Sequence, residues 1–273
     1  MFLRVATLAA LLSTPLYAQA PAEAPAKPTA KAPVTAPAPA SAARPAKAAL
    51  ALPSARTIVD RHIKAIGGRA AILAHKSMHT TGTMSMAGSG ISGPVEVYGQ
   101  APNRVLMKAS ISGIGEITEG FDGTHGWSIN PLTGPLLKTG KELEQTKIDA
   151  DFYGELRDPK KYTLRTVGKE TFDGRECYKI SVKRSDGSED FDFYDVATGL
   201  RAGSINTRET QMGTMTVTNT EGAYKKFGKL TQATVITQKT MGVEQKLILD
   251  TVEFNSVSPS VFEPPSAIKA LIK

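Results

Sequence analysis

Residues 119–127, EGFDGTHGW, place the carboxylates of Glu119 and Asp122 a few positions from the imidazole of His125. Side chains of these types at such spacing could serve as general acid and base or could ligate a metal ion. The Asp-Gly pair at 122–123 has a second interpretation, because Asp-Gly favours tight hairpin turns whose central residues adopt positive φ. The stretch is therefore either a reactive site or the corner between two strands.

A second copy of this pattern favours the corner. TFDGRECYKI at 171–180 repeats GFDGTHGWSI at 120–129, with an aromatic residue on either side of the Asp-Gly pair, but it has no histidine. A third Asp-Gly pair occupies 186–187. Because the aspartate is present where the histidine is absent, we predict a hairpin corner with Phe121 and Trp127 packed inward. A hydrolase with an unrecognised site around His125 is the alternative.

The other candidates for chemistry lack a complete motif. His75 and His79 straddle the predicted end of a helix, and no glutamate of the HExxH pattern lies between them. No GxSxG sequence supplies a serine nucleophile, and the glycine-rich stretch 88–93 lacks the lysine and helix that follow in a phosphate loop. Cys177 alternates with Lys179 on a predicted strand and has no histidine nearby. We therefore predict no enzymatic activity, no metal and no cofactor.

The first residues have the pattern of a secretory signal. Arg4 precedes an apolar run over 5–16, and small residues follow at Ala18, Ala20 and Ala22. We predict a signal peptide over 1–22, cut after about 18–22, and hence a soluble periplasmic protein without a stable membrane span after cleavage. No cysteine stands near the junction to carry a lipid. Since Cys177 is the only cysteine, no internal disulfide is possible.

Residues 23–53 are almost wholly Ala, Pro and Lys, which predicts a disordered, extended linker. The formal charge of +7 belongs partly to these terminal segments. Arg4 accounts for one positive charge, and the linker's four cations less Glu23 account for three, so +3 remains on residues 54–273. Such a mild charge does not indicate nucleic-acid binding. We predict that 54–273 forms a single domain.

Helices and strands alternate in blocks along that domain. Ser54 is the predicted cap of a helix whose apolar stripe runs from Ile58 to Ile66, and a shorter helix is predicted over 69–76. A third helix is predicted over 141–159 from the spacing of Ile148, Phe152 and Leu156, and a last one over 266–272.

Between these helices the apolar residues alternate with polar ones, as in strands. Val105, Met107, Ala109 and Ile111 share one face of a predicted strand, and Tyr178, Ile180 and Val182 share a face of another. The order predicts an α+β fold with one large, curved antiparallel sheet. A sheet this long tends to curl, and helices on one side leave a concave apolar face that needs a plug or a ligand.

Several motifs together resemble a family of exported bacterial proteins similar to the outer-membrane lipoprotein-sorting proteins LolA and LolB. They are the opening helix with its Gly-Gly, TGTM at 81–84, APNR at 101–104, the corner at 121–127, DVATGL at 195–200 and the ending at Phe262-Glu263-Pro264. The resemblance covers nearly all of 54–273. It implies a half-open β-barrel covered by a few helices, with an apolar cavity that holds lipoprotein acyl chains in the characterised carriers.

Two functions follow from these observations. The first is a non-enzymatic periplasmic carrier or sensor that binds an acyl chain, a lipoprotein lipid or another apolar ligand. The alternative is a periplasmic interaction module whose core is filled by its own side chains and which docks an envelope protein partner. The residues predicted to line the cavity are Met84, Met86, Val97, Met107, Phe121, Trp127, Phe152 and Phe193. Methionine suits such a surface because its side chain is flexible and polarisable.

Overall fold

The computed structural model describes residues 51–184, 187–210 and 213–272. The predicted signal peptide and nearly all of the predicted linker lie outside the described residues, as does Asp186 of the third Asp-Gly pair.

Two helices open the described chain. In α1 (Ala55–Ala65) the Ser54 hydroxyl accepts a hydrogen bond from the Thr57 amide at 3.1 Å, which caps the helix as predicted. Its apolar stripe is buried, and Gly67, at φ 120°, turns the chain towards α2 (Arg69–Ala74). A side chain at Gly67 would lie 2.3 Å from the Lys229 carbonyl oxygen, so only glycine fits at this crossing.

Thirteen strands form one antiparallel sheet in the order β6-β5-β4-β3-β2-β1-β15-β14-β11-β10-β9-β8-β7, and β12 and β13 form a separate hairpin. The strands of the large sheet are β1 (Ser77–Met86), β2 (Ser92–Gln100), β3 (Arg104–Ile111), β4 (Gly115–Phe121), β5 (Gly126–Asn130), β6 (Gly134–Leu137), β7 (Tyr162–Phe172), β8 (Arg175–Arg184), β9 (Glu189–Asp195), β10 (Arg201–Thr210), β11 (Gly213–Gly222), β14 (Val235–Thr240) and β15 (Val243–Phe254). The hairpin consists of β12 (Lys225–Phe227) and β13 (Leu230–Gln232).

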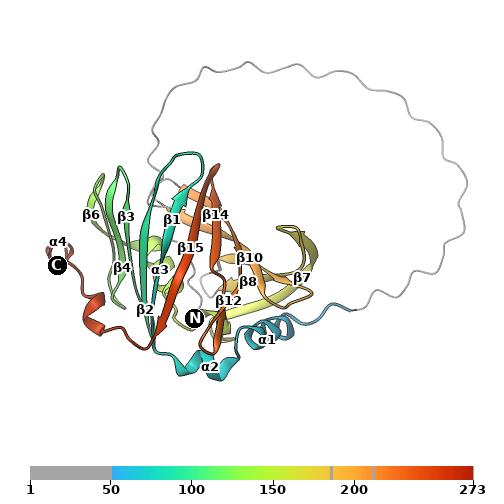
Figure 1. Ribbon diagram of the computed structural model, residues 1–273. Coiled ribbons are helices and arrows are strands. Elements are labelled where there is room, and N and C mark those ends of the chain that lie inside the picture. The colour runs from blue at the N-terminus through green and yellow to red at the C-terminus, as the bar shows by residue number, and fades with distance from the viewer. Residues whose placement is uncertain (1–50, 185–186, 211–212, 273) are drawn as a thin grey trace, which may run out of the picture. The chain divides into compact units, whose positions relative to one another are not determined.

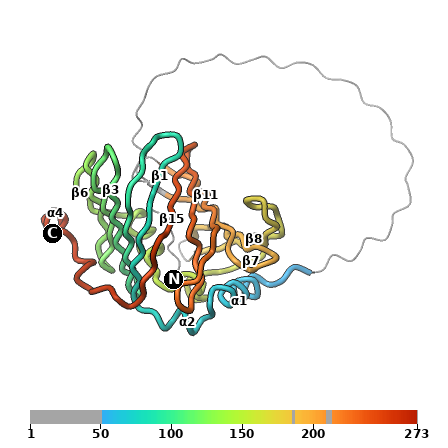
Figure 2. Tube along the Cα trace, in the orientation of Figure 1, coloured from blue at the N-terminus to red at the C-terminus, as the bar shows by residue number. Residues whose placement is uncertain are grey.

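The sheet curls without closing. Helix α3 (Gly140–Asp149) contacts both β5 and β10, which are the second and the tenth strands in the order, so the sheet bends around this helix. In the described part of the chain β6 and β7 each pair with a strand on one side only. The predicted α+β class with a large, curved antiparallel sheet is confirmed, and the open edges are consistent with a half-open barrel (Figures 1 and 2).

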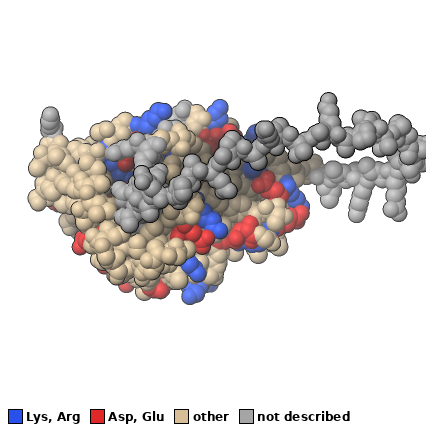
Figure 3. Space-filling model, turned by 90° about the horizontal axis from the view of Figure 1, so that it is seen from above, with Lys and Arg blue, Asp and Glu red and all other residues tan. Residues whose placement is uncertain are grey.

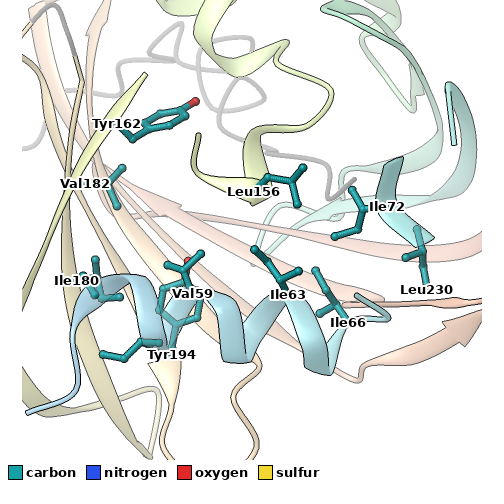
Figure 4. Packing of buried hydrophobic residues seen from close by; sticks show 12 residues of the cluster. Val59, Ile63, Ile66, Ile72, Leu156, Tyr162, Ile180, Val182, Tyr194 and Leu230 are labelled. Carbon is teal, nitrogen blue, oxygen red and sulfur yellow. The ribbon is translucent and has the colours of Figure 1, made fainter. Parts of the chain in front are cut away.

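We call the side of the sheet on which α1 and α3 pack its inner face. Under α1 this face is apolar: Val59 and Ile63 of the helix pack in one buried cluster with Ile180, Val182 and Tyr194 of β8 and β9 (Figure 4). The outer face of β3 to β6 is covered by the C-terminal segment, where η3 (Pro259–Phe262) and α4 (Ser266–Lys269) bury Phe262 and Ile268.

The two Asp-Gly corners in the described chain have different lengths. At 173–174 the turn has two residues, both with positive φ, as predicted. At 122–125 it has four residues, because Phe121 pairs with Gly126 and the Asp122 carboxylate accepts the Thr124 and His125 amides at 2.7 Å. The prediction of a corner between two strands is confirmed.

The predicted third helix is shorter than expected. It ends at Asp149, and the chain continues through the 3-10 turn η2 (Gly154–Leu156) to Arg157 in the left-handed conformation. The carboxylate of Asp151 accepts the Tyr153 amide at 3.2 Å, which favours a turn over further helix. Ile148 and Phe152 therefore do not share a helix face.

Candidate ligand-binding site

One half of the inner face is an apolar wall, built by β1 to β4 together with β14, β15 and Ala233. Its members alternate along the strands, so that Val97 pairs with Met107 and Val95 with Ala109 across β2 and β3. The buried cluster consists of Met84, Val95, Val97, Met107, Ala109, Ile111, Ile117, Ala233, Ile236, Leu247 and Leu249. Among the described residues no helical side chain belongs to this cluster, in contrast to the part of the face under α1.

Polar side chains follow on the same face, in a line that runs from β15 across β14 and β11 to β10. Gln245 of β15 pairs with Gln238 of β14, which pairs with Asn219 of β11, which pairs with Ser204 of β10. All four residues are buried, and we call them, with Asn206, the polar row. Sequence reasoning predicted an apolar hollow, and that prediction is wrong where the polar row lies.

Beyond the polar row lie two buried groups of ion pairs. In the first, the Arg201 guanidinium lies 2.7 Å from Glu155 of η2 and 2.7 Å from Glu221 of β11, and the Tyr224 hydroxyl donates to Glu221 at 2.9 Å. Glu155 also lies 3.3 Å from the His62 ring of α1. Burial alone lowers the pKa of Arg201, but the carboxylates outweigh it, so the net pKa is raised and the guanidinium stays charged.

The second group surrounds the aspartates of β9. Asp190 bonds Arg184 and lies 3.5 Å from Arg208, whose guanidinium also lies 3.5 Å from Asp149 of α3. Asp192 bonds Arg157, which follows η2. These contacts tie α1, η2 and α3 to the sheet. They hold the covering elements in place through buried charges, an arrangement that is costly to disrupt.

A separate buried pair joins β4 to the segment before α3. The Lys138 ammonium lies 3.1 Å from the Glu119 carboxylate, and both side chains are at most 9% exposed. Burial raises the pKa of Glu119, and the charge of Lys138 offsets only part of that effect. His125 lies in the turn that follows β4, where it is half-exposed and contacts Asp122 at 3.1 Å. Glu119 and His125, close in sequence, therefore belong to different surroundings.

Five of the eight residues predicted to line a cavity lie on the inner face: Met84, Met86, Val97, Met107 and Phe121. Phe152 is buried against Met78, outside the apolar wall. Trp127 and Phe193 point the other way. Trp127 packs with Phe262 and Ile268 on the outer face, and Phe193 stacks on Phe172 at 4.0 Å between ring centres.

Four hairpin turns at one end of the sheet, those next to the apolar wall and at β5–β6, are uncharged. The turns 87–91, 112–114, 131–133 and 241–242 lie at the same end, because the strands are antiparallel, and none contains Lys, Arg, Asp or Glu. Leu132 is 62% exposed and Met241 72%. Figure 3 views this end of the molecule, and its left part is largely free of charged side chains. An apolar molecule that approached the apolar wall from this end of the sheet would therefore meet few charged side chains.

Two features are absent from the described residues. They contain no group of three or more His, Cys, Asp or Glu side chains placed to hold a metal ion. They also contain no helix long and apolar enough to cross a membrane.

Comparison with known proteins shows the fold. The chain matches a DUF1329 family protein from Desulfovibrio piger with a TM-score of 0.54, covering 77% of this chain and 97% of that one at 12% identity. It matches a LolA superfamily protein from Nitrosomonas europaea with a TM-score of 0.53, covering 78% and 99%, also at 12% identity. No family model and no curated protein matches the sequence. The fold is thus LolA-like, which confirms at that level the resemblance found in the sequence.

Proposed function

We propose that this protein is an exported, non-enzymatic carrier or sensor that binds an acyl chain or similar apolar ligand in the periplasm. The observation that carries the proposal is the apolar wall, which in the described chain receives no helix although the adjoining part of the same face does. The LolA-like fold and the uncharged turns at one end of the wall support it. The proposal includes the export signal predicted over 1–22 and the extended linker predicted over 23–53.

The expected affinity is moderate. Burying a methylene contributes about 0.8 kcal/mol, so a chain of about fourteen carbons gains roughly 11 kcal/mol before costs. Loss of translational and rotational freedom offsets about 4 kcal/mol or more of this gain. The remainder corresponds to a Kd on the order of 10 μM. Such binding needs no reactive group.

A steric variant tests the proposal. Ala109 is buried in the middle of the wall, between Val95 and Ile117 of the adjacent strands. Ala109→Trp should fill the space of the ligand and weaken binding of a fluorescent fatty acid at least about tenfold. Lys108→Trp is the matched control, because its side chain is exposed on the outer face of the same strand. Equal affinities for both variants would argue against the wall as the site.

An interaction module is the second candidate, and the buried ion pairs favour it. Much of the inner face near β9 to β11 is already occupied by the protein's own charged side chains, as a self-filled core requires. Native mass spectrometry of protein purified from a Gram-negative host separates the two. Co-purified lipid supports the carrier, whereas one stoichiometric envelope protein with no lipid supports the module.

A further inference from the structure

The polar row adjoins the apolar wall, and the two meet at Gln245. Across the sheet Gln245 has Gln238 on one side and Met86 on the other. Along β15 the next residue on the same face is Leu247, a member of the wall. A molecule lying on the wall would thus bring its end to the amide of Gln245.

Hydrogen bonds within the row run in one direction. The Gln238 amide nitrogen donates to Asn219 at 3.1 Å, and the Asn219 amide nitrogen donates to Asn206 at 3.0 Å and to Ser204 at 3.3 Å. The Ser204 hydroxyl then donates to Asn206 at 2.8 Å. The side chains of Asn219, Asn206 and Ser204 therefore hydrogen-bond to one another.

Gln245 is the exception. Its side chain is 4% exposed, and its amide oxygen Oε1 has no hydrogen-bond partner among the described residues. A buried acceptor left unpaired destabilises a fold, so such groups are rare in native proteins and call for a reason. A hydroxyl or amide group of a ligand on the apolar wall would supply the missing donor.

The surroundings favour an uncharged polar group. The row itself consists of amides and a hydroxyl, which bind hydroxyl groups both as donors and as acceptors. Each buried lysine and arginine of the described chain, namely Lys138, Arg157, Arg184, Arg201 and Arg208, already lies within ion-pair distance of a carboxylate. A negatively charged head group would enter this space without a free cation to neutralise it.

We propose, on the basis of the carrier function, that the ligand is an amphiphile with an uncharged head group rich in hydroxyl or amide groups. Its hydrocarbon chain lies on the apolar wall, and its head group hydrogen-bonds to Gln245 at the end of the polar row. Gln245 is then a specificity-determining residue, which selects a hydroxylated or amide-bearing lipid over a free fatty acid of the same chain length.

Three probes with one acyl chain test this proposal: 1-monododecanoylglycerol, methyl dodecanoate and dodecanoate. The full chain should bind the glycerol ester most tightly. Gln245→Leu should weaken the glycerol ester about tenfold and leave the methyl ester within about twofold. The same variant should raise the Tm of the ligand-free protein by about 2–4 °C, because it removes an unpaired buried acceptor. Lys246→Leu, on the exposed face of the same strand, should leave the affinities for both esters unchanged.

The outcomes separate the two proposals. Tighter binding of dodecanoate than of the glycerol ester, or equal effects of Gln245→Leu on both esters, would overturn the head-group site while leaving the carrier function intact. If none of the three probes binds, the carrier function itself fails, and the head-group site fails with it.

Discussion

Replacing Arg201 by methionine tests whether the buried ion pairs hold the covering elements on the sheet. The guanidinium is 4% exposed and lies 2.7 Å from carboxylates of both Glu155 and Glu221, so the substitution leaves two buried carboxylates without their cation. Removing one partner of a buried pair costs about 3–5 kcal/mol. For a folded segment of this length the corresponding fall in Tm is about 6–20 °C.

Thermal unfolding followed by circular dichroism measures this change. Lys147→Met is the control, because the pair of Lys147 with Glu144 is exposed, and we expect it to change stability by less than about 1 kcal/mol. The triple variant Arg201→Met, Glu155→Gln, Glu221→Gln removes the stranded charges and should recover at least half of the loss. An Arg201→Met protein as stable as the Lys147→Met control would refute the reasoning.

Two further variants probe β4 and its contacts. Burial raises the pKa of Glu119 in the folded protein. Glu119 therefore stabilises the fold most below about pH 4.3, the pKa of a glutamate in the unfolded chain, where the group is protonated. This contribution to stability is lost as the pH rises through the raised pKa of the folded state. The variant Glu119→Gln, Lys138→Met should therefore gain stability relative to the wild type between pH 4 and pH 7 in urea titrations, and a constant difference would contradict this. Gly120→Ala should cost about 1–3 kcal/mol, because its methyl group would lie 2.2 Å from the Trp127 ring. Gly168→Ala, with open space around it, is the control, and equal stability of the two would contradict the packing.

The sequence predicted those parts of the fold that repeat a simple period. The stripe of α1 and the shared face of Val105, Met107 and Ala109 follow from spacing alone, and both are confirmed. The corner at 119–127 was also predicted, but the faces of its aromatic residues were not. With any even number of residues in that turn, Phe121 and Trp127 fall on opposite faces of the sheet, so the structure places Trp127 outward.

The spacing of residues gave a wrong prediction for the face on which Phe193 lies and for the polarity of the surface at the polar row. Alternation in β9 assigns the aromatic residues inward, yet Asp190 and Asp192 face inward because arginines from β8, β10 and the segment after η2 pair with them. Outside, Lys179 covers the Phe193 ring at 5.5 Å. Arg208 and Arg157 lie 18 and 35 residues from the aspartates that they contact, so the residues around Asp190 and Asp192 give no sign of them. In the sequence, Gln245 interrupts the alternating apolar residues Val243, Leu247 and Leu249 of β15. This interruption is the feature from which the polar row could have been predicted.

Photoaffinity labelling with a diazirine-bearing fatty acyl glycerol tests the central claim most directly. The account predicts saturable labelling confined to the inner-face residues of β1 to β4, β14 and β15, displaced by unlabelled 1-monododecanoylglycerol and reduced in Ala109→Trp. Absence of saturable labelling, or labels confined to the outer clusters around Trp127 and Phe193, would contradict it.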